Sequence, residues 1–363
     1  MEFGLSQEQN LLQHTVERYL EDASSLKKVR QFVEGDSSVA EQLIAGLCEL
    51  GISGILVPQK FGGSGLTVMD AALVQEALGR YVAPVDFTAG LAMAVIGILD
   101  SGTEVQQQDW LGKIARGDVH FSVAVSEHTG AREGAGVRIH NGMLTGKSLF
   151  ALGTGLATHI LVADTAGGLH VVDCEAYGLT QRRLVSIDKT RAMAELVFDR
   201  VPAETLGNNS QEGAAVAAMI RAGRTLLAAD SLGAAQMMLE RSVAYSLQRK
   251  QFGRAIGSFQ AVKHLCAEMA AELEPCRSLV WYAGYAIDAI PDEAELMSCL
   301  AKSHLADVSQ FVARTATEVH GGVGFTDELG LHYWFKRIGV NRQLLGSPER
   351  IRQQAARLQG WGN

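Results

Sequence analysis

Residue chemistry suited to a flat, anionic ligand is concentrated in one stretch, residues 249–260 (RKQFGRAIGSFQ). The Arg249 guanidinium is a rigid fork of donors that matches a phosphate or diphosphate. Phe252 and Phe259 carry rings that could cover a nucleotide base or a flavin. The same residues would also suit an ordinary corner between two helices with a solvated basic edge. The stretch alone therefore leaves both readings open.

Composition indicates a globular, acidic protein. The chain has 363 residues, of which 47% are hydrophobic and 20% charged, with only 6 Pro. This length exceeds one typical domain and predicts two or three packed units. A net charge of -8 gives no general attraction to nucleic acid or to an anionic membrane, so any phosphate site must be local.

Targeting and metal signals are absent from the sequence. Residues 1–6 lack a basic region followed by an apolar core, so we expect no signal peptide. The apolar runs 89–99 and 226–239 are too short or too interrupted for membrane insertion. The 5 Cys are scattered and the 10 His show no metal-ligand spacing, which favours reduced thiols and no metal. We expect a cytoplasmic protein.

Residues 1–118 show the spacing of amphipathic helices. Ser6 is a good helix N-cap, and the apolar residues after it recur with the period of an α-helix. A glycine-rich run at 50–65 predicts a loop with a tight backbone path. We therefore expect an all-helical N-terminal domain with helices at 6–20, 40–50, 70–78, 89–99 and 104–115.

Residues 119–206 change to short β-like runs separated by turn residues. Asn141 and Gly142 form a strong hairpin signal. Because no helices separate the runs, the pattern favours a small antiparallel sheet or barrel over a parallel Rossmann sheet. The predicted strands are 121–125, 136–139, 160–163, 169–172 and 194–198.

Helical periodicity returns over residues 207–363 and predicts a bundle. Leu232, Leu239, Val243 and Leu247 form one apolar stripe, and residues 320–325 (HGGVGF) interrupt the helical pattern. The predicted class is α+β, in three domains. These are an N-terminal helical domain (1–118), a central antiparallel β-sheet or barrel domain (119–206) and a C-terminal helical bundle (207–363).

Several motifs, in order along the chain, resemble the acyl-CoA dehydrogenase family over essentially the whole length. They lie at residues 50–65, 76–80, 198–207, 249–253 and 318–325. The resemblance implies a tetramer that holds FAD between the β domain and the bundle, with a neighbouring subunit completing the pocket. It also implies an acyl-CoA thioester substrate and an electron acceptor such as an electron-transfer flavoprotein.

The resemblance assigns cofactor roles to particular side chains. Ser126 keeps a hydroxyl that can bond the flavin ring, and Phe150 stands where the family usually has a Trp that covers the flavin. The residues expected to meet the FAD diphosphate and adenine across the subunit interface are Arg249, Gln251, Phe252, Ile256, Phe259, Gln260, Glu318, Gly321 and Gly322.

The family's catalytic base is missing from its expected positions. Members use a Glu to remove the α-proton of the thioester while hydride leaves the β-carbon for flavin N5. In most members this Glu would fall on Leu345 or Gly346, and in a minority on Gly223. The nearest carboxylates are Asp230, about two helical turns beyond Gly223, and Glu349. Asp230 is either an alternative base or a hydrogen-bonded structural residue.

Three further departures concern the flavin environment. Glu318 replaces a Gln that usually contacts FAD, and its carboxylate would repel a diphosphate unless it is protonated or paired. Leu152 replaces a hydroxyl residue near the flavin ring. The loop 128–133 lacks the family's Pro-Gly-Ala-Gly-Ser-Asp pattern.

These features lead to three hypotheses. In the first, the chain is a subunit with an empty base position that forms an α2β2 tetramer with a catalytic paralogue, as in bacterial steroid catabolism. In the second, it is a self-sufficient homotetramer that uses Asp230 or catalyses a base-free reaction such as elimination. In the third, it is a structural partner that binds neither flavin nor thioester.

Overall fold

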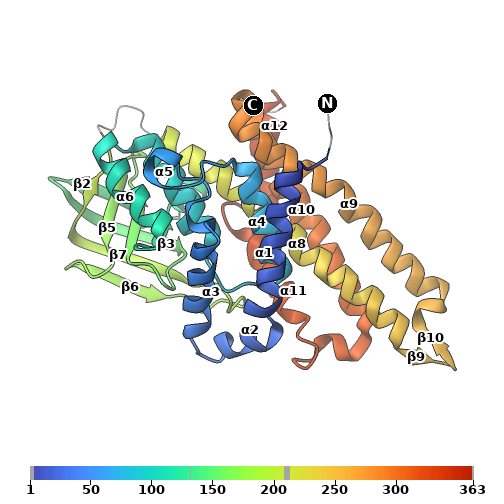
Figure 1. Ribbon diagram of the computed structural model, residues 1–363. Helices are drawn as coiled ribbons and strands as arrows, with labels where there is room; N and C mark the ends of the chain where they lie inside the picture. Colours follow the sequence, from blue (N-terminus) through green and yellow to red (C-terminus); the bar gives the residue numbers. More distant parts are fainter. Residues whose placement is uncertain (1–3, 131, 208–212, 362–363) are drawn as a thin grey trace. The chain divides into compact units, whose positions relative to one another are not determined.

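The computed structural model describes residues 4–130, 132–207 and 213–361. The chain forms two compact units, and both are assembled from separated parts of the sequence (Figure 1). We call them the terminal unit (Met1–Glu34, Ala72–Ala83 and Arg224–Asn363) and the central unit (Gly35–Ala71 and Pro84–Gly223). These units group the segments differently from the three predicted domains, whose boundaries remain a prediction.

The terminal unit is helical. Its first helix begins where the sequence predicted, because Ser6 forms a capping box with Gln9. Pro291 and Pro348 occupy the first turns of two later helices, where the missing N–H has no intrahelical partner to lose. The helices are α1 (Gln7–Ala23), α2 (Leu26–Val33), the end of α4 (Val68–Arg80), most of α8 (Ala214–Gln248), α9 (Gln260–Ala289), α10 (Pro291–His320), α11 (His332–Gln343) and α12 (Pro348–Leu358).

Helix α10 organises this bundle, because α9, α11 and α12 all pack against it. The predicted stripe on α8 is buried only in its first half. Leu232 is 0% and Leu239 8% exposed, whereas Val243 is 39% and Leu247 68% exposed. These exposed residues lie toward the end of α8 that leads into the hairpin of β9 (Lys250–Gln251) and β10 (Arg254–Ala255) (Figure 1).

Helices α4 and α8 cross at a distance that only glycine permits. A Cβ on Gly79 would lie 2.1 Å from the carbonyl oxygen of Asp230, and a Cβ on Gly233 would lie 1.8 Å from that of Glu76. Both neighbours are backbone atoms of a helix, which cannot move aside as a flexible side chain can. The crossing explains why small residues stand in the motifs around 76–80 and 232–233.

The central unit combines helices with a single sheet. Two 3-10 turns, η1 (Ile52–Gly54) and η2 (Gln59–Phe61), occupy the predicted glycine-rich loop. The predicted helix 89–99 is a π-helix, η3 (Phe87–Met93), followed by α5 (Ala94–Ser101). Helices α3 (Ser38–Glu49) and α6 (Glu104–Arg116) form as expected. Among the described residues, no helix has the length and apolar character needed to span a bilayer.

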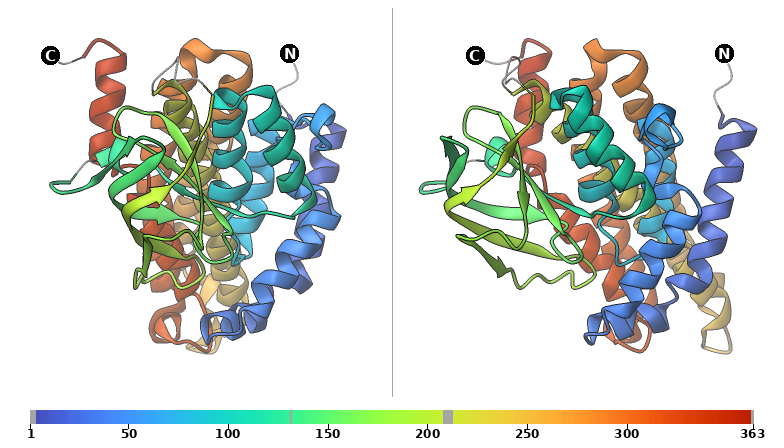
Figure 2. Two further views of the ribbon diagram at one scale, coloured as in Figure 1. Left: turned by 90° about the vertical axis from the view of Figure 1, so that its left-hand side faces the viewer. Right: turned by 60° about the vertical axis from the view of Figure 1, so that its left-hand side comes forward.

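The sheet has the order β6-β7-β3-β1-β4-β5-β8, with β2 paired to β3, and it curls on itself (Figure 2). Its pairs are antiparallel as predicted, except that β1 and β4 run parallel. Its core includes Val137, Leu144, Leu196 and Phe198. The strands are β1 (Phe121–Ala124), β2 (Gly136–His140), β3 (Met143–Leu152), β4 (His159–Ala163), β5 (Leu169–Asp173), β6 (Leu179–Arg183), β7 (Met193–Pro202) and β8 (Glu204–Thr205).

Candidate functional site

Residues 249–255 form a β-hairpin at the end of α8 and not a simple helix corner. Gln251 pairs with Arg254 across the two strands, and Phe252 and Gly253 make the turn. Both turn residues have positive φ, 51° for Phe252 and 77° for Gly253, which is the backbone of a tight hairpin turn. The Phe252 side chain is 91% exposed, and Arg249 and Gln251 are also exposed.

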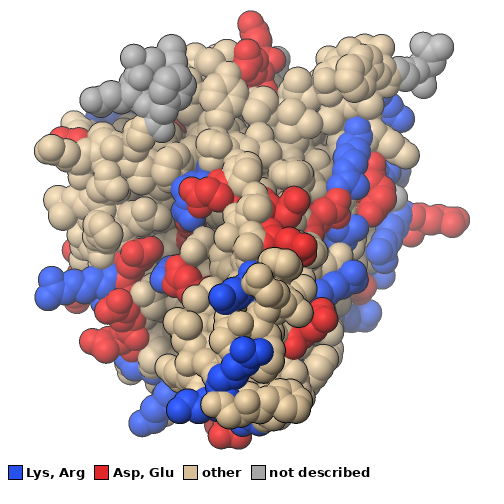
Figure 3. All heavy atoms as spheres, turned by 90° about the vertical axis from the view of Figure 1, so that its right-hand side faces the viewer, with Lys and Arg blue, Asp and Glu red and all other residues tan. Residues whose placement is uncertain are grey.

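The rest of this stretch follows the hairpin closely. The 3-10 turn η4 (Ile256–Ser258) leads into α9, which begins at Gln260. Phe259 contacts Phe252 edge to face at 6.1 Å between ring centroids. The side of the molecule that carries α9 and the hairpin shows Lys and Arg side chains around its lower end (Figure 3). Ile256, Phe259 and Gln260 therefore lie beside the aromatic and basic tip, and their expected contact with FAD stays a prediction.

The glycine motif after α10 lies near the same end of the bundle. Tyr245, close to the end of α8, stacks against His320 at the end of α10, with 4.7 Å between ring centroids. Gly321 has a φ of 64° and begins the turn η5 (Gly321–Phe325). A Cβ on Gly322 would meet nothing within 4 Å and its φ is not left-handed, so nothing within this chain requires glycine there. Glu318 is exposed one turn earlier.

In the central unit, one carboxylate joins Ser126 to β3, the strand that carries Phe150. Glu127, in the short helix α7 (Glu127–Gly130), accepts hydrogen bonds from Ser126 Oγ (3.1 Å), Ser148 Oγ (2.9 Å) and Leu149 N (2.8 Å). The Ser126 hydroxyl thus donates to Glu127 and keeps its oxygen as an acceptor. Phe150 follows Leu149 and lies under the Arg132 guanidinium at 5.2 Å. Residue 131 of the loop 128–133 lies outside the described residues.

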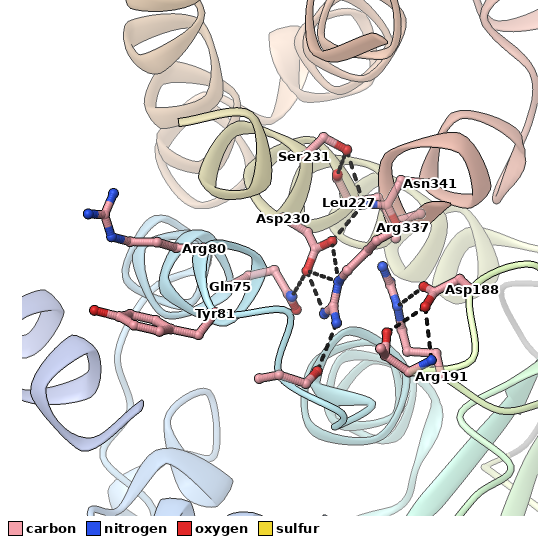
Figure 4. A network of polar contacts seen from close by, with 12 residues as sticks. Gln75, Arg80, Tyr81, Asp188, Arg191, Leu227, Asp230, Ser231, Arg337 and Asn341 are labelled. Atoms are coloured by element: carbon pink, nitrogen blue, oxygen red, sulfur yellow. Dashed lines mark hydrogen bonds and ion pairs between the residues drawn. The ribbon is translucent and has the colours of Figure 1, made fainter. Parts of the chain in front are cut away.

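Asp230 is enclosed in a buried polar network (Figure 4). Asp230 and Arg337 are both 0% exposed, and Arg337 donates to the carboxylate from Nη2 (2.8 Å) and Nε (2.9 Å). Asn341 Nδ2 (2.6 Å) and Gln75 Nε2 (2.7 Å) donate to the two carboxylate oxygens. The remaining Arg337 nitrogen binds the Ala83 carbonyl at 2.8 Å. This geometry supports the structural reading of Asp230 and argues against its use as a base.

The expected base positions hold no carboxylate. Leu345 is 5% exposed and adopts a φ of 56°, and Gly346 has a φ of 113°. The Leu345 carbonyl accepts a hydrogen bond from Arg224 Nε at 3.0 Å, and Gly223 directly precedes that arginine. Glu349 is a surface residue, with a side chain 64% exposed and paired with Arg342 at 2.9 Å. Arg224 thus holds the backbone at Leu345, but none of the expected positions carries a carboxylate that could act as a base.

Comparisons with known proteins agree with these features. The acyl-CoA dehydrogenase N-terminal domain matches residues 6–118, and the acyl-CoA dehydrogenase C-terminal domain matches residues 212–359. The acyl-CoA dehydrogenase IpdE2 of Mycolicibacterium smegmatis is 30% identical over 356 residues, which cover 98% of this chain and 99% of that protein. The chain belongs to the acyl-CoA dehydrogenase family. The family resemblance and the predicted fold class are therefore confirmed.

Solved structures extend this relationship. A steroid ACAD described as Tcur3481-Tcur3483 superposes with a TM-score of 0.88 at 28% identity, covering 98% of each chain. The butyryl-CoA dehydrogenase of Megasphaera elsdenii superposes with a TM-score of 0.87 at 23% identity, covering 98% of this chain and 99% of that one, and shows the shared fold. Acyl-CoA dehydrogenases are FAD-dependent oxidoreductases, and FAD is the family's cofactor.

The residues at the hairpin and at η5 have the chemistry that a dinucleotide requires. Arg249 and Gln251 present donors to solvent, Phe252 presents an exposed ring, and Gly322 leaves an open surface that no contact within the chain explains. Among the residues that the structure describes, no cluster of three or more His, Cys, Asp or Glu side chains could hold a metal ion.

Sequence reasoning missed a buried lysine that contacts Arg342, three residues before Leu345. Lys302 is 2% exposed, and its Nζ donates to the Arg342 carbonyl at 3.2 Å. Burial, together with the positive charges of Arg224 and Arg342, lowers the pKa of Lys302 to about 7. Its spacing from Cys299 and Leu305, each three residues away and 0% exposed, was the available signal of burial.

Proposed function

We propose that this chain is the subunit without a catalytic base in an α2β2 acyl-CoA dehydrogenase, paired with a catalytic paralogue. One observation carries the proposal. The base positions hold Gly223, Leu345 and Gly346, while the nearest carboxylate on α8, Asp230, is fully buried and ion-paired with Arg337. The steroid ACAD similar to this chain is described by two polypeptide names, which supports pairing and a steroid-derived acyl-CoA substrate.

In this proposal the hairpin of this chain contacts an FAD that the partner subunit also binds. FAD supplies the acceptor for the substrate hydride. Arg249 and Gln251 would donate to the diphosphate, Phe252 would cover the adenine, and Gly321 and Gly322 would let the backbone approach the ligand. The exposed position of Glu318 keeps its carboxylate in water, which reduces repulsion from the diphosphate.

Reduced flavin needs an electron acceptor, and we propose an electron-transfer flavoprotein for this role. A relative at 25% identity, CarC of Acetobacterium woodii, is named as a subunit of a caffeyl-CoA reductase-Etf complex. We also propose that the enzyme works in the cytoplasm.

One observation favours a second function, a homotetramer in which each chain holds its own FAD. Ser126 keeps the hydroxyl expected near the flavin and Phe150 keeps an aromatic ring, and the Glu127 carboxylate bonds both Ser126 and Leu149, the residue before Phe150. A chain that contacts FAD only through its hairpin would not need residues that contact the flavin ring. Such an enzyme would use a base other than Asp230 or catalyse an elimination. A structural partner without flavin contact is the third possibility.

Co-expression with a paralogue encoded nearby distinguishes these functions. We expect an α2β2 complex with one FAD per αβ pair that oxidises acyl-CoA thioesters with an artificial electron acceptor, and we expect the chain alone to be inactive. The homotetramer requires instead that the chain alone carries one FAD per subunit and turns over. A colourless, active complex whose activity is insensitive to Arg249→Ala would favour the structural partner.

A further inference from the structure

The hairpin lies within a stretch that has many cations and no acids. Residues 241–267 contain Arg241, Arg249, Lys250, Arg254 and Lys263 but no Asp or Glu, in a chain whose net charge is -8. Like charges this close in sequence repel one another. The concentration of positive charge at this tip is therefore an unusual local feature of an acidic protein.

The cations at the tip are also unneutralised. Within the described residues, no carboxylate forms an ion pair with Arg249, Lys250, Arg254 or Lys263. Several arginines elsewhere in the terminal unit are paired, such as Arg80 with Glu240 at 2.6 Å. An exposed cluster of unpaired cations attracts an anion and increases its local concentration. The tip is thus suited to an anionic ligand from outside the chain.

Arg254 is the member of this cluster with the best-defined geometry. It lies directly opposite Gln251 in the hairpin, and directly opposed residues of an antiparallel pair project from the same face. Its guanidinium lies 4.0 Å over the ring of Phe259. Stacking of this kind restrains the flat guanidinium but leaves its N–H edges free to donate.

We propose that Arg254 is a second diphosphate-binding arginine, which acts with Arg249 on the adenosine diphosphate group that FAD and CoA share. The inference rests on the proposed function and deepens it. Gln251, which the family resemblance assigns to the cofactor, and Arg254 would approach the ligand from one face of the hairpin. Phe259 would then act as a platform for Arg254, in addition to any contact with the cofactor.

Titration of the full-length protein, alone and in its complex, tests this inference. FAD, FMN and CoA are titrated by calorimetry into wild type, Arg254→Gln, Arg254→Lys and Arg249→Ala. Arg357→Gln is the matched control, because it removes the same charge from an exposed position on α12. Hydrogen bonds to charged groups predict a loss of FAD affinity of about tenfold or more for Arg254→Gln. FMN, which lacks the adenosine monophosphate half of FAD but keeps one of its two phosphates, should lose less affinity than FAD in the Arg254 and Arg249 variants.

Each outcome has a separate meaning. A loss for Arg254→Gln, a smaller loss for Arg254→Lys and no change for Arg357→Gln support the inference. If Arg254→Gln weakens the binding of CoA but not of FAD, the inference is also supported, and the ligand of Arg254 is then the CoA part of the thioester. If Arg249→Ala weakens FAD binding while Arg254→Gln binds both FAD and CoA as wild type does, the inference is wrong and the proposed function stands. If wild type in its complex binds no FAD, both are wrong.

Discussion

At the scale of single residues, the buried ionisable side chains separate structural from chemical roles. The Asp230 carboxylate receives hydrogen bonds from Arg337, Asn341 and Gln75, so both of its oxygens are occupied. A general base must instead reach a substrate proton with a free lone pair. The network joins α4, α8 and α11, which indicates a role in fixing these helices.

Asp230→Asn should therefore destabilise the protein without a specific effect on chemistry. The substitution leaves the Arg337 charge buried and uncompensated, which costs about 3–5 kcal/mol. Denaturant unfolding measures this loss. The double substitution Asp230→Leu with Arg337→Met should recover much of it, because both charges are removed. A stable Asp230→Asn protein that had lost only turnover would instead identify Asp230 as the base.

Lys302 predicts a dependence of stability on pH. Its folded pKa of about 7 lies below the ordinary lysine pKa of 10.5, so the unfolded chain binds more protons between these values. Stability should rise with pH from about 7 toward 10, by at most about 1.4 kcal/mol per pH unit. Unfolding curves of wild type and Lys302→Met at several pH values test this. The free energy of unfolding of wild type should rise relative to that of Lys302→Met as pH rises. A difference between the two free energies that stays constant with pH would contradict the prediction.

At the scale of elements, the crossing of α4 and α8 is the most demanding contact in the terminal unit. Gly79 and Gly233 let two helix backbones touch, and the Arg80–Glu240 pair, with a 2.6 Å contact, joins the same helices. The buried Glu76 carboxyl, whose pKa is raised by burial, pairs with Arg277 of α9. Charge and close packing thus fix α4 against α8 and α9.

Gly233→Ala should separate these helices and destabilise the protein by about 1–3 kcal/mol or more, as expected for overpacking. Gly322→Ala is the matched control, because its Cβ would meet nothing within 4 Å. We expect thermal unfolding to show a lower Tm for Gly233→Ala and an unchanged Tm for Gly322→Ala. Gly322→Ala should instead weaken the binding of FAD. Equal Tm values for the two variants would disprove the packing argument.

Elements with clear periodicity could be predicted from the sequence, whereas features set by distant partners could not. Helix α6, with Thr103 and Gly117 as caps, and the hairpin turn at Asn141 match expectation. The π-helix at Phe87–Met93 was not foreseen, because its residues are buried on every side and show no helical alternation of polar and apolar side chains. The environment of Asp230 depends on Arg337, 107 residues away in sequence, which no local pattern reveals.

At the scale of the whole molecule, the exposed apolar side chains near the hairpin indicate a surface for assembly. Leu247 is 68%, Phe252 91% and Phe325 79% exposed, and they lie in α8, the hairpin and η5. Exposed apolar groups gathered around a candidate binding site are typical of protein interfaces. This supports the proposed tetramer, in which a second subunit covers this end.

Leu247→Glu should weaken assembly while leaving the folded chain intact. The substitution places a charge where the proposed interface is apolar, and charged residues are depleted from interface cores. Leu11→Glu is the matched control, because Leu11 is 67% exposed on α1. Light scattering coupled to size exclusion should show dissociation for Leu247→Glu alone. Dissociation of both variants, or of neither, would speak against an interface at Leu247.

Because the terminal unit is assembled from separated segments of the sequence, its parts are synthesised at different times. Helices α1 and α2 are synthesised before the other parts of their unit, and the largest of these parts, which begins at Arg224, follows 190 residues after Glu34. At typical translation rates this delay is roughly 10–40 s. Val16, Leu20 and Val29 are all 0% exposed in the folded protein, and the unit that buries them is incomplete during that time. A chaperone that shields the apolar faces of α1 and α2 would therefore act during this interval.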